Sequence, residues 1–280
     1  MAGSTIPAKM QFYQFFLRMK LFSGLILLLF LLPGFTQASV VILNGLSHTH
    51  AVNSSESPIN GVIQVKNEGL KDSRIVVYRQ DIISECGKVV AYPESGSHPR
   101  SLGNWMKTNV DEKLLASNEV YDLRYAITLD KQKITPGTYW EVIMVEVGEP
   151  IKEKQKNGIE VSSSVRYAIQ VIVDVASYES PELTYENVVF GKMQGFQGAL
   201  NVTLKNNGTF GTRASVILEV YDASGNKLKT TQPANRMLYP GNCATFEILV
   251  NDLPKGKYDC VIIADTKQDL FGSNISLQIE

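Results

Sequence analysis

The sequence predicts an all-β protein built from two β-sandwich domains in tandem. Three observations support this fold class. Short segments in which apolar and polar residues alternate, about seven in each half of the chain, are separated by turn signals. No segment shows convincing helical periodicity. A turn that leads through Gly-x-Tyr into a strongly apolar strand occurs twice, once in each half, at residues 136–146 and 254–263.

The first of these two segments runs from Pro136 to Glu146. Pro136 presets φ for the turn, and Gly137 permits a positive φ. The residues that follow are apolar on both faces, which is typical of a strand in the middle of a sheet. Gly-x-Tyr before such a strand is the sequence form of the tyrosine corner of immunoglobulin-like sandwiches. The second copy, with Tyr258, therefore predicts a second immunoglobulin-like domain.

Residues 1–38 have the features of a cleaved signal peptide. Arg18 and Lys20 precede the apolar run 21–32, a Pro-Gly pair ends that run, and small residues up to Ala38 offer a cleavage site. The apolar run is shorter than the ~20 residues that span a bilayer as a helix. We therefore expect a protein of the periplasm, or one that is secreted or held in the cell envelope, without membrane insertion after cleavage. An uncleaved anchor is the alternative.

The first domain is expected over residues 39–176 and the second over 182–280, with 176–181 as the linker. In the first domain we expect strands at 39–43, 59–66, 74–81, 119–129, 139–146 and 165–175. In the second we expect strands at 183–190, 199–205, 214–221, 243–250, 257–264 and 274–279. An Asn-x-Gly turn ends the second strand of each set, at Asn67 and at Asn206, so the two halves look like an internal repeat. The loop 94–104 makes the first domain the more elaborate one.

Three motifs of the first domain point to a known family. They are Gly61-Val62-Ile63-Gln64-Val65-Lys66-Asn67-Glu68-Gly69, Val77-Tyr78-Arg79-Gln80-Asp81 and Arg100-Ser101-Leu102-Gly103-Asn104-Trp105. With the strands at 136–146 and 165–175, residues 39–175 resemble the periplasmic pilus-assembly (usher-pathway) chaperones and their chaperone-like relatives. The resemblance implies a non-enzymatic protein that binds pilus, fimbrial or other envelope subunits.

The resemblance also implies a mechanism, in which the chaperone adds an edge strand to an incomplete subunit. It implies that the last strand of the first domain contacts the subunit and that Arg166 is a possible anchor for the subunit's carboxylate. The subunit-binding residues expected on this basis are Val161, Val165, Arg166, Tyr167, Ile169 and Val171. The partner is then a protein, and we expect the chain itself to be a monomer.

Two other binding functions remain open. An adhesion or adaptor module would bind through the loop 94–104 and Trp105, and a sugar-binding sandwich would need exposed aromatic rings near that loop. The net charge of −1 over 280 residues gives no footprint for nucleic acid. His48 and His50 share one face of a strand, but no nearby carboxylate or Cys completes a metal site. We expect no cofactor, no metal and no catalytic site.

The chain has three cysteines, Cys86, Cys243 and Cys260. In an oxidising compartment Cys243 and Cys260 are the natural candidates for a disulfide. A hairpin between their strands would instead place Cys260 opposite Phe246, and Cα atoms beyond about 7 Å cannot be bridged. The alternative is a Cys260 that is a small core residue, with Cys86 as a loop thiol.

Overall fold

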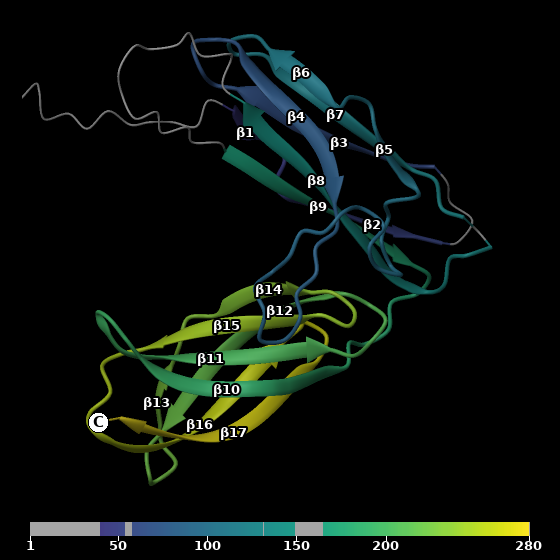
Figure 1. Cartoon of the computed structure of the whole chain (residues 1–280). Helices are drawn as coiled ribbons and strands as arrows, with labels where there is room; N and C mark the ends of the chain where they lie inside the picture. Colours follow the sequence, from purple (N-terminus) through teal and green to yellow (C-terminus); the bar gives the residue numbers. More distant parts are fainter. Residues whose placement is uncertain (1–39, 54–57, 131, 149–164, 280) are drawn as a thin grey trace, which may run out of the picture. The chain divides into compact units, whose positions relative to one another are not determined.

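A computed structural model describes residues 40–53, 58–130, 132–148 and 165–279. In this part of the chain the regular secondary structure consists of β-strands alone, and the strands form two sandwiches (Figure 1). The predicted all-β class with two immunoglobulin-like sandwiches is therefore confirmed. The predicted signal peptide and Val161 lie outside the described residues. Within the described residues no helix is long and apolar enough to cross a membrane.

The first sandwich consists of two sheets. One has the strand order β1-β3-β7-β5, and the other has the order β2-β9-β8-β4-β6. The bounds are β1 Val40–Ile42, β2 Ser47–Val52, β3 Ile59–Asn67, β4 Ser73–Gln80, β5 Met106–Thr108, β6 Glu112–Leu115, β7 Val120–Ile127, β8 Gly137–Gly148 and β9 Val165–Val175. The core lies between the two sheets, where alternate residues of each strand are buried. As predicted, the Gly-x-Tyr strand β8 lies inside its sheet and is buried on both faces.

The second sandwich also has two sheets. β10, β11 and β15 form one in that order, and β13-β12-β16-β17 form the other, in which β14 also pairs with β12. The bounds are β10 Leu183–Met193, β11 Phe196–Asn206, β12 Thr212–Tyr221, β13 Lys227–Thr230, β14 Ala234–Leu238, β15 Cys243–Val250, β16 Gly256–Asp265 and β17 Leu270–Ile279. A separate apolar cluster around Phe246 and Ile262 forms its core.

The tyrosine corners predicted from the sequence occur in both sandwiches. The Tyr258 hydroxyl donates to the carbonyl of Pro254 at 2.7 Å. In the first sandwich the Tyr139 hydroxyl accepts from the backbone N–H of Thr135 at 3.0 Å. In both cases the ring bonds the backbone four residues upstream, as a tyrosine corner does. Gly137 has φ +126°, and a side chain there would meet the carbonyl of Thr209 in the second sandwich.

The two Asn-x-Gly turns are also equivalent. Asn67 ends β3, and its side-chain amide donates to the carbonyls of Lys71, Leu115 and Ala116. Asn206 ends β11, and its amide donates to the carbonyls of Phe210 and Leu238. Each side-chain oxygen accepts the backbone N–H of the glycine two residues on. Both side chains are fully buried, and their hydrogen bonds hold the neighbouring loops in place.

Candidate partner-binding site

Part of one edge of β9 is open. On one side β9 pairs with β8 along its whole length, Val165 to Val175. On the other side β2 pairs with β9 in parallel, but this ladder covers only residues 170–175. No described strand pairs with residues 165–169 on that side. Since unpaired backbone groups at a sheet edge are a template for another strand, this half of β9 can accept one.

Exposed apolar side chains lie at the two ends of this open edge and in the segment that leads to it. The segment 43–46 leads from β1 in one sheet to β2 in the other, and its Leu46 carbonyl accepts the backbone N–H of Gln170 at the end of the open edge. Its Leu43 and Leu46 are each 48% exposed, and Val165 at the start of β9 is 38% exposed. A strand added at this edge would therefore find apolar contacts beside its backbone hydrogen bonds.

The residues predicted to bind a subunit lie on β9, but in different environments. Val165 is exposed, whereas Tyr167 is half-buried and its hydroxyl donates to the carbonyl of Val40. Ile169 and Val171 are fully buried in the sandwich core. Only the backbone edge of Ile169 is open, and that of Val171 is paired with His48 of β2. The open part of the predicted site is thus Val165 to Ile169.

Arg166, the expected carboxylate anchor, is paired within the protein. Its Nε lies 2.9 Å from a carboxylate oxygen of Glu146 on β8, which also accepts a hydrogen bond from Tyr78. The hydrogen bond and charge of Glu146 raise the pKa of Arg166. Arg166 lies four residues before Gln170, the residue at which the open edge ends. Four residues correspond to about 13 Å along a strand. Its charge is therefore compensated, and it lies away from that end.

The open edge ends at a cleft of about 660 Å³. Gln170, Leu46 and Ser47 line it from the first sandwich. The loop between β4 and β5 contributes a second wall, and β14 and the start of β15 contribute a third. Because Gln170 is the first residue of β9 that β2 covers, a strand that paired with residues 165–169 would run directly into this cleft.

The cleft is cationic. Arg213, Arg236 and Lys88 line it, and no acidic side chain is among its described lining residues. Lys88 forms a 2.6 Å ion pair with Glu85, which leaves the two arginines of the second sandwich as the main positive charges. Arginine suits such a site because its planar guanidinium binds carboxylates through two parallel hydrogen bonds.

Tyr239 connects the arginines to the end of the open edge. Its hydroxyl donates to the side-chain oxygen of Gln170 at 2.7 Å. Burial raises the pKa of this hydroxyl, the nearby charge of Arg213 opposes that rise, and Tyr92 adds to it. Arg213, Tyr92 and Tyr239 line the same cleft. A carboxylate bound by Arg213 would lie next to the point where an added strand leaves β9.

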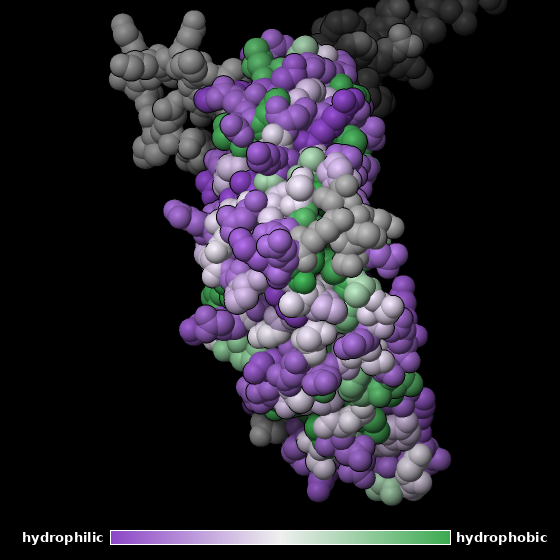
Figure 2. Space-filling model, turned by 90° about the vertical axis from the view of Figure 1, so that its right-hand side faces the viewer, coloured by the Kyte–Doolittle hydropathy of each residue, from purple (hydrophilic) through white to green (hydrophobic). Residues whose placement is uncertain are grey.

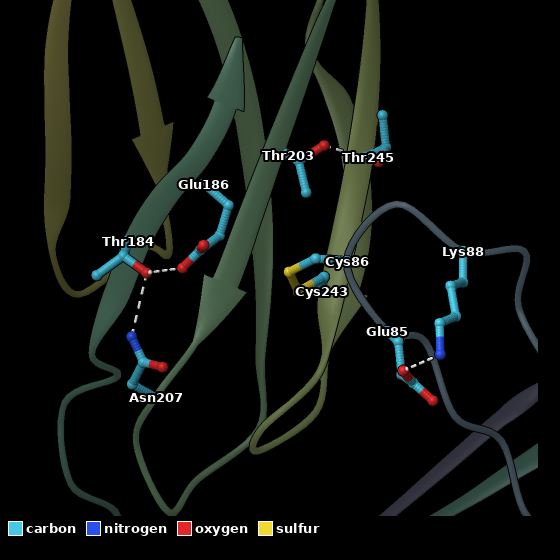
Figure 3. The surroundings of a disulfide bond; sticks show 9 residues. All are labelled: Glu85, Cys86, Lys88, Thr184, Glu186, Thr203, Asn207, Cys243 and Thr245. Carbon is cyan, nitrogen blue, oxygen red and sulfur yellow. Dashed lines mark hydrogen bonds and ion pairs between the residues drawn. A yellow bond between two sulfur atoms is a disulfide. The ribbon is translucent and has the colours of Figure 1, made fainter.

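The disulfide differs from the predicted one. Cys86 in the loop between β4 and β5 is joined to Cys243 at the start of β15, with Cα atoms 5.0 Å apart (Figure 3). Cys260 is free and buried, and burial raises its thiol pKa to about 11. The pairing of Cys243 with Cys260 is wrong because β15 and β16 do not form a hairpin but belong to opposite sheets. The disulfide joins the two sandwiches and is typical of an oxidising compartment.

The loop 94–104, which the adaptor alternative would use for binding, is fixed by hydrogen bonds to two buried carboxylates. The backbone N–H and hydroxyl of Ser97 and the hydroxyl of Ser101 all donate to the buried carboxylate of Asp81. Ser95 donates to the buried Glu141 on β8. These hydrogen bonds attach the loop to the sheet.

The tryptophans do not form an exposed platform. Trp140 is buried between the rings of His98 and Tyr239, and Trp105 packs on Tyr139. His48 and His50 both lie beside the Tyr125 ring, and His50 Nε2 is 2.8 Å from its hydroxyl. The described residues contain no group of three or more His, Cys, Asp or Glu side chains placed to hold a metal ion.

Sequence reasoning missed the cleft. Arg213 and Arg236 belong to the second domain, and nothing local marks them as neighbours of Gln170 across 40 or more intervening residues. One signal was present, namely Cys86 in a predicted loop of a chain whose first 38 residues have the pattern of a signal peptide. A disulfide from that loop to the second domain would have placed the loop at the boundary between the sandwiches.

No family model and no curated protein matches the chain. Solved structures do match it. The YadV chaperone is 12% identical over 86% of this chain and 100% of that chain, with a TM-score of 0.44. The CsuC–CsuE chaperone–tip adhesion subunit pre-assembly complex of Csu pili from Acinetobacter baumannii is 14% identical over 85% and 98%, with a TM-score of 0.46. The E. coli chaperone DraB is 15% identical over 86% and 98%, with a TM-score of 0.40. These are pilus chaperones, the group that the motifs resemble, and the likeness is one of fold.

Proposed function

We propose that this protein is a non-enzymatic, chaperone-like protein of the cell envelope that binds a β-structured partner by strand addition. The partner strand pairs with the open edge of β9 at residues 165–169, and its C-terminal carboxylate enters the cleft beside Arg213 and Arg236. The observation that carries the proposal is the continuity between the two parts: the open edge ends at Gln170, and Gln170 lines a cleft with two arginines and no described acid.

The geometry gives the partner strand a direction. β9 runs toward the cleft as its residue numbers rise from 165 to 170. A partner strand whose C-terminus lies in the cleft must therefore run parallel to β9, as β2 does beyond Gln170. Backbone hydrogen bonds supply affinity in such an addition, whereas side chains and the terminal charge supply specificity.

Site-specific crosslinking tests this proposal. A benzophenone amino acid is placed at Leu43 or Val165 in the tagged full-length protein expressed in the envelope. Leu228 on β13 is the control position, since it is 49% exposed against 48% for Leu43. We expect Leu43 and Val165 to crosslink to the last strand of one β-rich envelope protein and Leu228 not to. Equal crosslinking from Leu228, or attachment to an internal segment of the partner, would refute the proposal.

Charge variants separate the two candidate anchors. Arg213→Ala with Arg236→Ala removes the proposed carboxylate site, and Arg166→Ala removes the residue expected from the family resemblance. A charge-assisted hydrogen bond contributes about 1.5–3 kcal/mol, so the cleft variant should weaken partner binding at least tenfold. Arg166→Ala should change binding by less than threefold because Glu146 already compensates that charge. A large loss of binding in Arg166→Ala, with little loss in the cleft variant, would identify Arg166 as the carboxylate anchor instead.

A further inference from the structure

The loop between β4 and β5 has an unusual surface. We call residues 82–93 the tether loop. Its base is closed by a pair of backbone hydrogen bonds between Ile83 and Ala91, and its outer part is joined to β15 by the disulfide at Cys86. The backbone N–H of Cys243 also donates to the carbonyl of Ser84 at 2.7 Å. The loop is therefore fixed to the second sandwich at two adjacent points.

The fixed loop presents apolar side chains to the cleft. Val89 is 90% exposed, Val90 is 44% exposed and Tyr92 is 41% exposed, and all three line the cleft. Leu46, also exposed, lines the same cleft from the end of the open edge. Single exposed apolar residues are common on protein surfaces, but several gathered on one cleft indicate a binding surface.

Figure 2 shows one face of the molecule, on which the visible hydrophobic residues are scattered in small patches between hydrophilic ones. The exposed apolar side chains of the tether loop, in contrast, line one cleft together with Arg213 and Arg236.

The position of these side chains relative to the arginines defines what they can contact. Tyr92 and Val90 line the same cleft as Arg213 and Tyr239, so the apolar wall and the cation face one binding space. A terminal carboxylate bound by Arg213 would bring the last side chain of its strand against this wall. An apolar or aromatic residue there would bury its surface, whereas a polar residue would lose hydration without a partner.

We infer that the tether loop selects partners by the last side chain before the C-terminal carboxylate, and that it favours an apolar or aromatic one. This inference rests on the proposed function, because it takes the carboxylate to be bound in the cleft. The Cys86–Cys243 disulfide is part of the specificity site, since it holds the loop where its side chains line the cleft.

Peptide binding measured by fluorescence anisotropy tests it on the protein spanning residues 39–280. The probe is a fluorescein-labelled peptide of two lysines and an alternating Val-Thr segment that ends in Phe with a free carboxylate. A second peptide ends in Ser, and a third ends in a Phe amide. We expect the Phe carboxylate to bind at least tenfold more tightly than the Ser peptide, because an aromatic side chain is buried. We expect it to bind at least tenfold more tightly than the Phe amide, because the arginines bind a carboxylate.

Variants assign the selectivity to the loop. Val90→Ser with Tyr92→Ser should reduce the Phe-over-Ser preference to less than threefold while the carboxylate-over-amide preference remains. Cys86→Ser should have the same effect. Val189→Ser on β10, an exposed valine away from the cleft, is the control and should change neither preference. Equal binding of the Phe and Ser peptides, or selectivity that survives both loop variants, overturns the inference. Equal binding of the carboxylate and amide peptides overturns the proposed function instead.

Discussion

The indole of Trp140 stacks on the ring of Tyr239, with centroids 4.6 Å apart and planes 13° apart. Trp140 belongs to β8 of the first sandwich, and Tyr239 directly follows β14 of the second. The contact is reinforced on both sides. Trp140 donates its Nε1–H to the carbonyl of Ile82, and the Tyr239 hydroxyl donates to Gln170. The two sandwiches thus share a small apolar cluster of their own, which also includes Ile172.

Truncation of Tyr239 tests this cluster. Tyr239→Phe keeps the stacked ring and loses one hydrogen bond, so the free energy of unfolding should fall by about 1 kcal/mol. Tyr239→Ala also removes the ring and should cost about 3–5 kcal/mol. Urea denaturation followed by tryptophan fluorescence measures both. Equal losses in the two variants would show that the ring contributes no packing energy.

Removal of the disulfide should lower stability. Cys86 and Cys243 are 157 residues apart, and closing so long a loop restricts the unfolded chain strongly. Cys86→Ser should therefore reduce the free energy of unfolding by about 3–5 kcal/mol. Guanidinium denaturation in the absence of reductant measures the loss. A reductant should destabilise the original protein and leave Cys86→Ser unchanged, and a variant with an unaltered midpoint would contradict the prediction.

The buried carboxyl of Glu141 should make stability depend on pH. Burial raises its pKa to about 7, while its hydrogen bond from Ser95 and the charge of Arg79 act in the opposite direction. Since the folded protein then holds this proton more tightly than the unfolded chain, stability should fall as pH rises from 4.5 to 7. The loss for this one group is about 3 kcal/mol.

Glu141→Gln removes this titration and isolates its effect. The difference in unfolding free energy between the variant and the original protein should grow between pH 4.5 and 7 and then stay constant. His98 titrates in the opposite sense, because burial lowers its pKa and stability is lost as pH falls below 6.5. Its contribution cancels in the difference, provided that the variant keeps the loop 94–104 in place. A pH-independent difference would contradict the raised pKa.

The buried asparagines Asn67 and Asn206 should be equivalent in energy. Replacing either by Ala removes two or more side-chain hydrogen bonds to buried or part-buried backbone carbonyls, at about 2–4 kcal/mol. Asn207→Ala is a matched control, because this exposed neighbour makes one side-chain bond, to Thr184. It should cost less than about 0.5 kcal/mol. Thermal unfolding of the three variants checks the ranking, which a large loss in Asn207→Ala would contradict.

The fold was predictable where local pattern and tertiary structure agree. Strands β9 and β15 have the bounds that alternation predicts, and Tyr139 and Tyr258 form the predicted corners. Strands β5, β6, β13 and β14 were missed because they have only three to five residues each. Alternation has too few positions to show over such lengths.

The candidate site was predictable only in part. The resemblance of the first domain directed attention to β9, but alternation alone cannot tell which half of a strand lacks a neighbour. That depends on β2, a polar strand that pairs with β9 in parallel from Gln170 onward. Arg213 and Arg236 reach the cleft through pairings of the second sandwich, and the burial of Ile169 and Val171 follows from both sheets together.

Under the proposed function, the disulfide between Cys86 and Cys243 has a consequence for the kinetics of partner binding. A cleft whose walls are joined covalently has its width set before a partner arrives, so little ordering remains to be done on binding. Association can then proceed at rates typical of rigid docking, and differences among partners appear in how long each one stays. A partner whose C-terminus fits the cleft would then dissociate slowly, and one whose C-terminus does not fit would dissociate quickly.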